Sequence, residues 1–260
     1  MAKKGHDELA PRSNGQMQEI PEYLRPKPGA ARLGNENVTN EDVIVPRIAL
    51  AQSNSFELKK SHAKYIDSLE AGQFFNTATK EVYGAALRVV NVHYFRSRIR
   101  WNGKEIGAGI LCRSDNGAQG IGDPGGVCAT CEFSKFNTEE EDSRPSCMMF
   151  MNFPCLVVPK SGVVDPAGIV IVSFKSLAIK AGKHWNTLVN IRNADRFAGV
   201  YKLSAVEDHR ASGDSYQPSI ENDGWVTKEQ LEAAAASYDL INSWRAAGRM
   251  PAPESETVAV

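Results

Sequence analysis

The sequence predicts a mainly β fold of the α+β class, an antiparallel barrel or curled sheet with peripheral helices. Two observations predict it. Five or six short strand-like segments follow one another between residues 74 and 206, separated by turn residues. Helical periodicity is confined to two segments late in the chain, one after residue 176 and one at 227–247.

The composition is that of an ordinary globular protein with a sizeable core. The chain has 260 residues, 42% of them apolar, and a net charge of −1. Affinity for nucleic acid would therefore have to come from a local patch. No apolar run approaches the ~20 residues that cross a bilayer, and the N-terminus lacks the apolar core of a secretory signal. We expect an intracellular protein.

The first elements follow a polar arm. Residues 1–40 are rich in Lys, Pro, Gly and Asn, which predicts a flexible segment, and order is expected to begin at 43–50. Residues 74–77 and 82–85 predict a hairpin. A long strand is expected over 87–101, with 106–112 pairing to it across a turn at 102–104.

The second half of the chain begins with a long polar loop, and strands and helices follow it. Residues 113–146 are too long and too polar for a plain loop in a compact domain. Strands are expected at 148–158, 168–174 and 197–206, and Ser176 is a candidate helix cap. Residues 227–230 form a capping box that opens the last helix.

These elements predict four parts: an arm at 1–40, a β domain at 41–210, a linker and C-terminal helix at 211–248, and a loose tail at 249–260. The strand count fits an OB-like barrel, the oligonucleotide/oligosaccharide-binding fold with five strands, carrying the loop 112–147 as an insertion. A β-sandwich fits nearly as well.

Four of the five cysteines occur as Cys112-x15-Cys128-x2-Cys131-x15-Cys147. Zinc in structural sites takes four tetrahedral ligands, and a Cys-x2-Cys pair offers two thiolates from one tight turn. The sequence therefore predicts a structural Zn²⁺ that staples the loop to the sheet, with no open position for catalysis. Incidental buried thiols and a redox pair at 128–131 are the alternatives. Cys155 is expected to be an ordinary core residue.

A basic and aromatic strand is the second signal. Alternation places Tyr94, Arg96, Arg98 and Arg100 on one face, and successive arginines lie ~6.5–7 Å apart, close to the phosphate repeat of an extended single strand. Tyr94, and Trp101 at the strand end, are candidates for base stacking. Other cations that would widen such a groove are Arg88, Lys104, Lys175, Lys180 and Lys183, with Lys202. The alternative is an edge strand protected by charge.

Motifs for catalysis are missing from the sequence. It contains no P-loop, dinucleotide fingerprint or nucleophile elbow, and its five histidines are scattered. We expect a protein that is not an enzyme.

Several segments resemble a widespread group of bacteriophage proteins: residues 46–48, 72–77, 112–115, 128–131, Cys147 and 176–181. The match spans roughly residues 43–206. The resemblance implies a zinc-containing single-stranded DNA-binding protein of the oligonucleotide-binding barrel type, acting in phage replication or recombination in the cytoplasm of the infected bacterium. Many such proteins end in an acidic tip that recruits partners, whereas residues 251–260 contain two acids. The helix 227–247 is the expected substitute for contacts with replication proteins.

Three functions follow as hypotheses. The leading one is sequence-tolerant binding of single-stranded DNA. The second is a zinc-stapled interaction module that binds a polymerase subunit or virion component. The third is a DNA-processing nuclease whose carboxylates converge in the fold.

Overall fold

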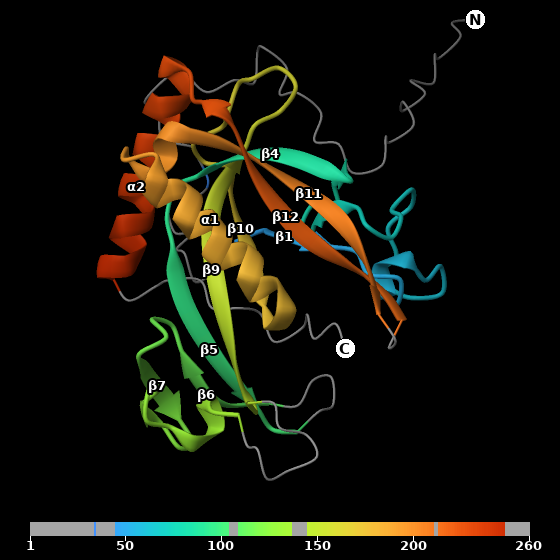
Figure 1. Cartoon of the computed structure of the whole chain (residues 1–260), viewed down its shortest axis with the longest axis vertical. Coiled ribbons are helices and arrows are strands. Elements are labelled where there is room, and N and C mark those ends of the chain that lie inside the picture. The colour runs from blue at the N-terminus through green and yellow to red at the C-terminus, as the bar shows by residue number, and fades with distance from the viewer. Residues whose placement is uncertain (1–33, 35–44, 104–108, 137–144, 211–212, 248–260) are drawn as a thin grey trace, which may run out of the picture.

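The structure is a computed structural model, and it describes residues 34, 45–103, 109–136, 145–210 and 213–247 (Figure 1). These residues form a mixed sheet with helices against it. The strands are β1 Arg47–Leu50, β2 Phe74–Asn76, β3 Val82–Gly84, β4 Ala86–Asn91, β5 Phe95–Trp101, β6 Ile110–Ser114, β7 Gln119–Gly122, β8 Gly126–Val127, β9 Cys147–Val157, β10 Ile169–Lys175, β11 Gly199–Arg210 and β12 Gly213–Trp225. The two α-helices are α1 Ile179–Ile191 and α2 Lys228–Ala246, and short 3-10 turns lie at Phe56–Leu58, Glu132–Ser134, Ser176–Ala178 and Arg196–Ala198.

The sheet is open, although the chain is mainly β as predicted. Its strands run β3-β2-β1-β10-β9-β5-β6-β7-β8, and a branch of β4, β11 and β12 leaves the other part of β9. The pair β1 and β10 is parallel, and the remaining pairs in the described ranges are antiparallel. Strand pairing therefore does not close the antiparallel barrel that the sequence suggested.

The single strand expected over residues 87–101 is two strands in the structure, β4 and β5, and the branch of the sheet explains the break. Residues 87–101 are broken at 92–94, and β4 and β5 pair with different stretches of the same edge of β9. Between those stretches lies Pro154, which has no N–H to donate to a neighbouring strand. Its carbonyl accepts from the backbone N–H of both Val92 and His93. The two segments diverge from this point, and β5 carries the arginines away from β4.

The hairpin β11–β12 curls back towards the N-terminal strands (Figure 1). The side chain of Gln52, just after β1, donates to the carbonyl of Tyr216 in β12 and accepts from its N–H, each at 2.9 Å. A Cβ on Gly72 would lie 2.7 Å from the Tyr216 ring, so this glycine admits the ring. A side-chain amide thus joins β12 to the segment just after β1, where the sheet has no strand pairing. The strand at 213–225 was not predicted from the sequence.

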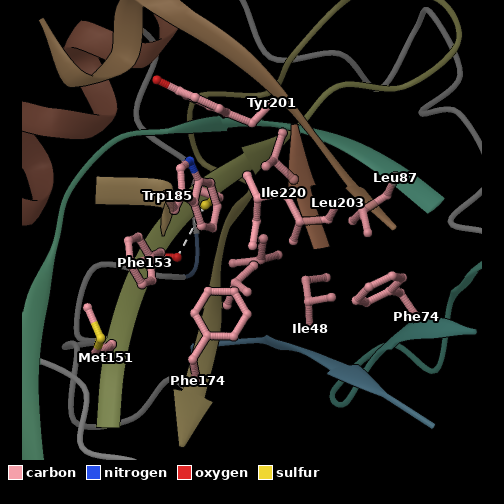
Figure 2. Packing of buried hydrophobic residues seen from close by; sticks show 14 of the residues in the cluster. Ile48, Phe74, Leu87, Met151, Phe153, Phe174, Trp185, Tyr201, Leu203 and Ile220 are labelled. Carbon is pink, nitrogen blue, oxygen red and sulfur yellow. Dashed lines mark hydrogen bonds between the residues drawn. The ribbon is translucent and has the colours of Figure 1, made fainter. Parts of the chain in front are cut away.

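The main core lies in the concavity of this curled sheet, where Trp185 of α1 enters (Figure 2). Its ring is fully buried and stacks on Phe153 at 4.6 Å between centroids. Helix α1 approaches closely because Gly182 has no side chain: a Cβ there would lie 3.0 Å from Phe174. The helix is preceded by a 3-10 turn at 176–178, so Ser176 is not its cap.

Helix α2 packs against a second core cluster on the other side of the sheet. Ala234 and Ile241 are fully buried there. The predicted capping box is confirmed: Thr227 accepts from the N–H of Gln230, whose side chain accepts from the N–H of Thr227. No helix within the described ranges is long and apolar enough to cross a membrane.

Candidate metal centre and nucleic-acid interface

Strand pairing brings two of the four cysteines together. Cys112 on β6 and Cys147 on β9 both stand opposite Arg100 on the central strand β5. Directly opposite residues in antiparallel strands point to the same face. The three side chains therefore form one row across the sheet, with a thiol on each side of the guanidinium.

The other two cysteines come from the loop that follows β6. Cys128 and Cys131 line the same pocket as Cys112 and Cys147, together with Arg100. The turn between them is held by Ser134, whose hydroxyl donates to the carbonyls of Cys128 (2.9 Å) and Cys131 (2.7 Å). All four are free thiols, and Cys155 lies apart from them in the main core.

The pKa of Cys147 reflects this crowding. Burial raises it above the ordinary value, the other three thiols raise it further, and Arg98 lowers it. In the described ranges, no three or more His, Cys, Asp or Glu side chains are arranged so that they could hold a metal ion.

The cysteine loop is fixed onto the arginine face of β5. The guanidinium of Arg100 stacks over the Phe133 ring at 3.5 Å, donates to the Asp123 carbonyl at 3.2 Å and lies 3.8 Å from the Asp123 carboxylate. At the other end of the strand, a Cβ on Gly117 would lie 2.7 Å from the Cβ of Arg96. The loop therefore lies along most of the face that the sequence assigned to DNA.

Two further predicted contact residues are partly covered. Arg98 is half-buried, donates to the Met149 sulfur at 3.9 Å, and has an Nε that is buried without a partner. Trp101 points to the opposite face, edge-on to Phe150, and its indole N–H is also buried without a partner. Of the expected β5 groups, Arg96 remains exposed and Tyr94 half-exposed.

The remaining predicted cations are spread over the molecule. Arg88 pairs with Asp223 on β12. Lys175 ends β10, where burial lowers its pKa, and Lys180 and Lys183 lie exposed on α1. Lys104 lies outside the described residues. On α2, Leu231, Tyr238 and Leu240 remain 38–40% exposed, and its role in binding partners stays a prediction.

A row of alternating arginine and aromatic side chains runs from β5 past α1 to the end of β12. We call it the arginine–aromatic row. Arg96 donates to the Tyr94 hydroxyl at 2.9 Å, and Arg196 lies 5.5 Å over the Tyr94 ring. Farther along, Arg192 lies 5.0 Å from the Tyr201 ring centroid and 4.7 Å from that of Trp225. The members are Arg96, Tyr94, Arg196, Tyr201, Arg192 and Trp225.

The three guanidiniums of this row have neutral partners. Arg196 donates to the side-chain carbonyls of Asn91 (2.7 Å) and Asn186 (3.0 Å), and burial lowers its pKa. Both Arg192 and Arg196 lower the pKa of the buried Tyr201 hydroxyl, against the larger effect of burial, so their charges meet at that residue. In the part of the chain that the structure describes, none of the three arginines forms an ion pair with a carboxylate.

Sequence reasoning missed Arg192, Arg196 and Trp225. The two arginines follow the predicted helix in a polar stretch, and a single residue separates Trp225 from the capping box, so no motif marks them. Their meeting depends on the pairing of β11 with β12, and β12 was not predicted.

Comparison with protein families identifies a match. The family described as Pam3 phage gp34-like protein matches residues 13–247. No curated protein matches, and no solved structure matches.

Proposed function

The chain belongs to the Pam3 phage gp34-like protein family, and from this premise we propose that it binds single-stranded DNA, without sequence preference, during replication or recombination of phage DNA in the cytoplasm of the infected bacterium. The observation that carries the proposal is the charge of the arginine–aromatic row. A half-buried cation without an anionic partner is costly, and a phosphate would offset that cost. Unpaired bases stack on aromatic rings, and the row offers the half-exposed Tyr94 and the exposed Trp225.

We propose a different set of phosphate contacts from the arginines of β5 that the sequence indicated. Arg100 holds the cysteine loop, and Arg98 lies against the Met149 sulfur and near Cys147. The phosphate-binding groups in this proposal are Arg96, Arg192 and Arg196. The cysteine loop then serves as one wall of the interface.

A salt-dependent titration of labelled oligo-deoxythymidine, read by fluorescence anisotropy, tests this function. Each phosphate contact contributes about 0.7 to the slope of log affinity against log salt for single strands. Arg96→Gln is expected to weaken binding and lower the slope by about that amount. The matched control is Arg113→Gln, an exposed arginine of β6 near Asp115. Absence of binding at low salt would refute the proposal, as would equal affinity for duplex.

We further propose that Cys112, Cys128, Cys131 and Cys147 hold one structural Zn²⁺ that fastens the loop to β5, β6 and β9. Four thiolates fit a closed tetrahedral site. The zinc would supply folding free energy to a loop that has few apolar side chains. Arg100, between Cys112 and Cys147, would offset part of the thiolates' negative charge.

Elemental analysis of purified protein measures this directly. We expect about one zinc per chain in the natural sequence and loss of the metal in Cys128→Ser. Cys155→Ala is the matched control, because Cys155 is buried in the main core and should leave the zinc content unchanged. Folded natural protein that contains no zinc would overturn the assignment.

A further inference from the structure

Trp225 is an exposed aromatic residue at the end of the arginine–aromatic row. It is the last residue of β12, and 63% of it is open to solvent. The preceding residue, Gly224, has φ +103°, a backbone conformation that L side chains rarely adopt. Glycine at this position thus sets the direction from which the indole leaves the strand.

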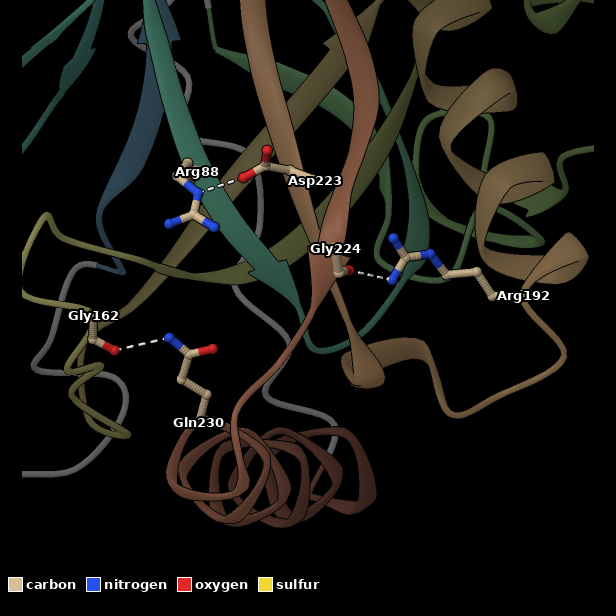
Figure 3. A network of polar contacts seen from close by, with 6 residues as sticks. All are labelled: Arg88, Gly162, Arg192, Asp223, Gly224 and Gln230. Atoms are coloured by element: carbon tan, nitrogen blue, oxygen red, sulfur yellow. Dashed lines mark hydrogen bonds and ion pairs between the residues drawn. The ribbon is translucent and has the colours of Figure 1, made fainter.

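One face of this indole is covered by a cation that is itself held in place. Arg192 donates from Nε to the side chain of Asn222 at 3.1 Å. Its Nη1 donates to the carbonyl of Gly224 at 2.7 Å (Figure 3). Gly199 admits the guanidinium, since a Cβ there would lie 2.1 Å from Nη1. The guanidinium lies close to the rings of both Trp225 and the buried Tyr201.

The nearest carboxylate along β12 does not neutralise this arginine. Asp223 pairs instead with Arg88, and the two arginines approach β12 from opposite sides (Figure 3). The exposed end of the row therefore presents a fixed aromatic ring beside a positive charge. A planar group that carries an adjacent negative charge is complementary to it.

We propose that Trp225 stacks an unpaired nucleobase and that Arg192 binds the phosphate next to that base. This inference rests on the proposed function and names its base-contacting residue. A nucleotide of a single strand offers both groups, whereas the base faces of a duplex are covered by their neighbours. Because Arg192 already fixes the indole, little side-chain freedom is lost when the base binds.

The test compares Trp225→Ala and Trp225→Phe with the natural protein, using the same oligo-deoxythymidine titration. Stacking contributes about 1–3 kcal/mol per base, so Trp225→Ala should weaken binding about 5- to 140-fold. The salt slope should stay unchanged, since an indole neutralises no phosphate. Trp225→Phe should retain part of the affinity. Ile191→Ala, which removes an exposed apolar side chain at the end of α1, is the control.

Replacing one thymidine after another by an abasic site gives a second readout. If a base stacks on Trp225, the natural protein and Trp225→Ala should bind the abasic strand with nearly the same affinity. Normal binding by Trp225→Ala would overturn this inference and leave the proposed function intact. An equal loss in Ile191→Ala would also overturn it, because the contact would then be generally apolar. If no strand binds the natural protein, both proposals fail together.

Discussion

At the scale of single residues, a chain of polar side chains crosses the sheet between its strands. Arg47 of β1 donates to the Ser173 hydroxyl at 2.7 Å, and Ser173 donates to Asn152 at 2.8 Å. Asn152 in turn donates to the hydroxyl of Ser97 at 2.9 Å. Asn152 and Ser97 are fully buried. Buried polar groups that are paired in this way specify strand register, and they become costly when one partner is removed.

Asn152→Ala should therefore destabilise the fold. The substitution removes the donor to the Ser97 hydroxyl and the acceptor of the Ser173 hydroxyl, and a buried group that loses its hydrogen bond costs about 1–3 kcal/mol. Urea unfolding followed by far-UV circular dichroism measures the change in the free energy of unfolding. Asn190→Ala, at an exposed position of α1, is the control and should stay within about 0.5 kcal/mol. Equal stability of both variants would show that the chain of hydrogen bonds contributes nothing.

At the scale of elements, His93 lies at the contact between helix α2 and the sheet. The imidazole lies 6.0 Å from the Tyr238 ring of α2, and its Nδ1 accepts the backbone N–H of Tyr94 at 2.8 Å. Burial lowers the pKa of His93, and the charges of Arg245 and Arg196 lower it further. The neutral imidazole is thus the form that fits this contact.

The sign of the pH dependence follows. The pKa of His93 is lower in the folded chain than the ~6.5 of an unfolded chain, so the unfolded state takes up the proton first. The contribution of His93 to stability is fully present above its pKa in the unfolded chain, and it is lost as the pH falls through its pKa in the folded chain. Amide hydrogen exchange in α2 should therefore speed up as the pH falls below about 6.5, after correction for intrinsic exchange.

His93→Phe provides the comparison for this effect. Phenylalanine keeps a ring beside Tyr238 and cannot be protonated, so the corrected exchange in α2 should lose most of its pH dependence. The same exchange profile in the natural protein and in His93→Phe would assign the effect to another group.

The elements that the sequence predicted well are those whose signals are local. The capping box of α2, the hairpin of β2 and β3 and the pairing of β5 with β6 depend on residues close together in the chain. The predicted cysteines also share one pocket, because β6 and β9 both pair with β5. The break at 92–94 was not predictable locally, since its cause is Pro154, about sixty residues later in the chain. Arg100 is likewise covered by the ring of Phe133, and no sequence pattern around Phe133 indicates that contact.

At the scale of the whole molecule, β12 meets the segment after β1 through the side chain of Gln52 and the packing of the Tyr216 ring on Gly72. Gln52 takes the place of a strand residue, donating to the carbonyl of Tyr216 and accepting its N–H. Nearby, Pro218 has no N–H to offer an incoming strand. The edge of β12 is thus partly satisfied within the chain. Closing the curl also keeps β11 and β12 over the main core, where Leu203 and Ile220 are buried.

Gln52→Ala should open this contact. Two hydrogen bonds at a partly buried position are lost, and each contributes about 0.5–1.5 kcal/mol, so unfolding should become easier by about 1–3 kcal/mol. Amide exchange should rise first at Tyr216, whose N–H loses its acceptor, and along the outer edge of β12. Gln119→Ala, at an exposed position of β7, is the control. Slow exchange at Tyr216 in Gln52→Ala would mean that the packing of the Tyr216 ring on Gly72 holds β12 to the segment after β1. Gly72→Ala, which places a Cβ against the ring, would then be the more damaging substitution.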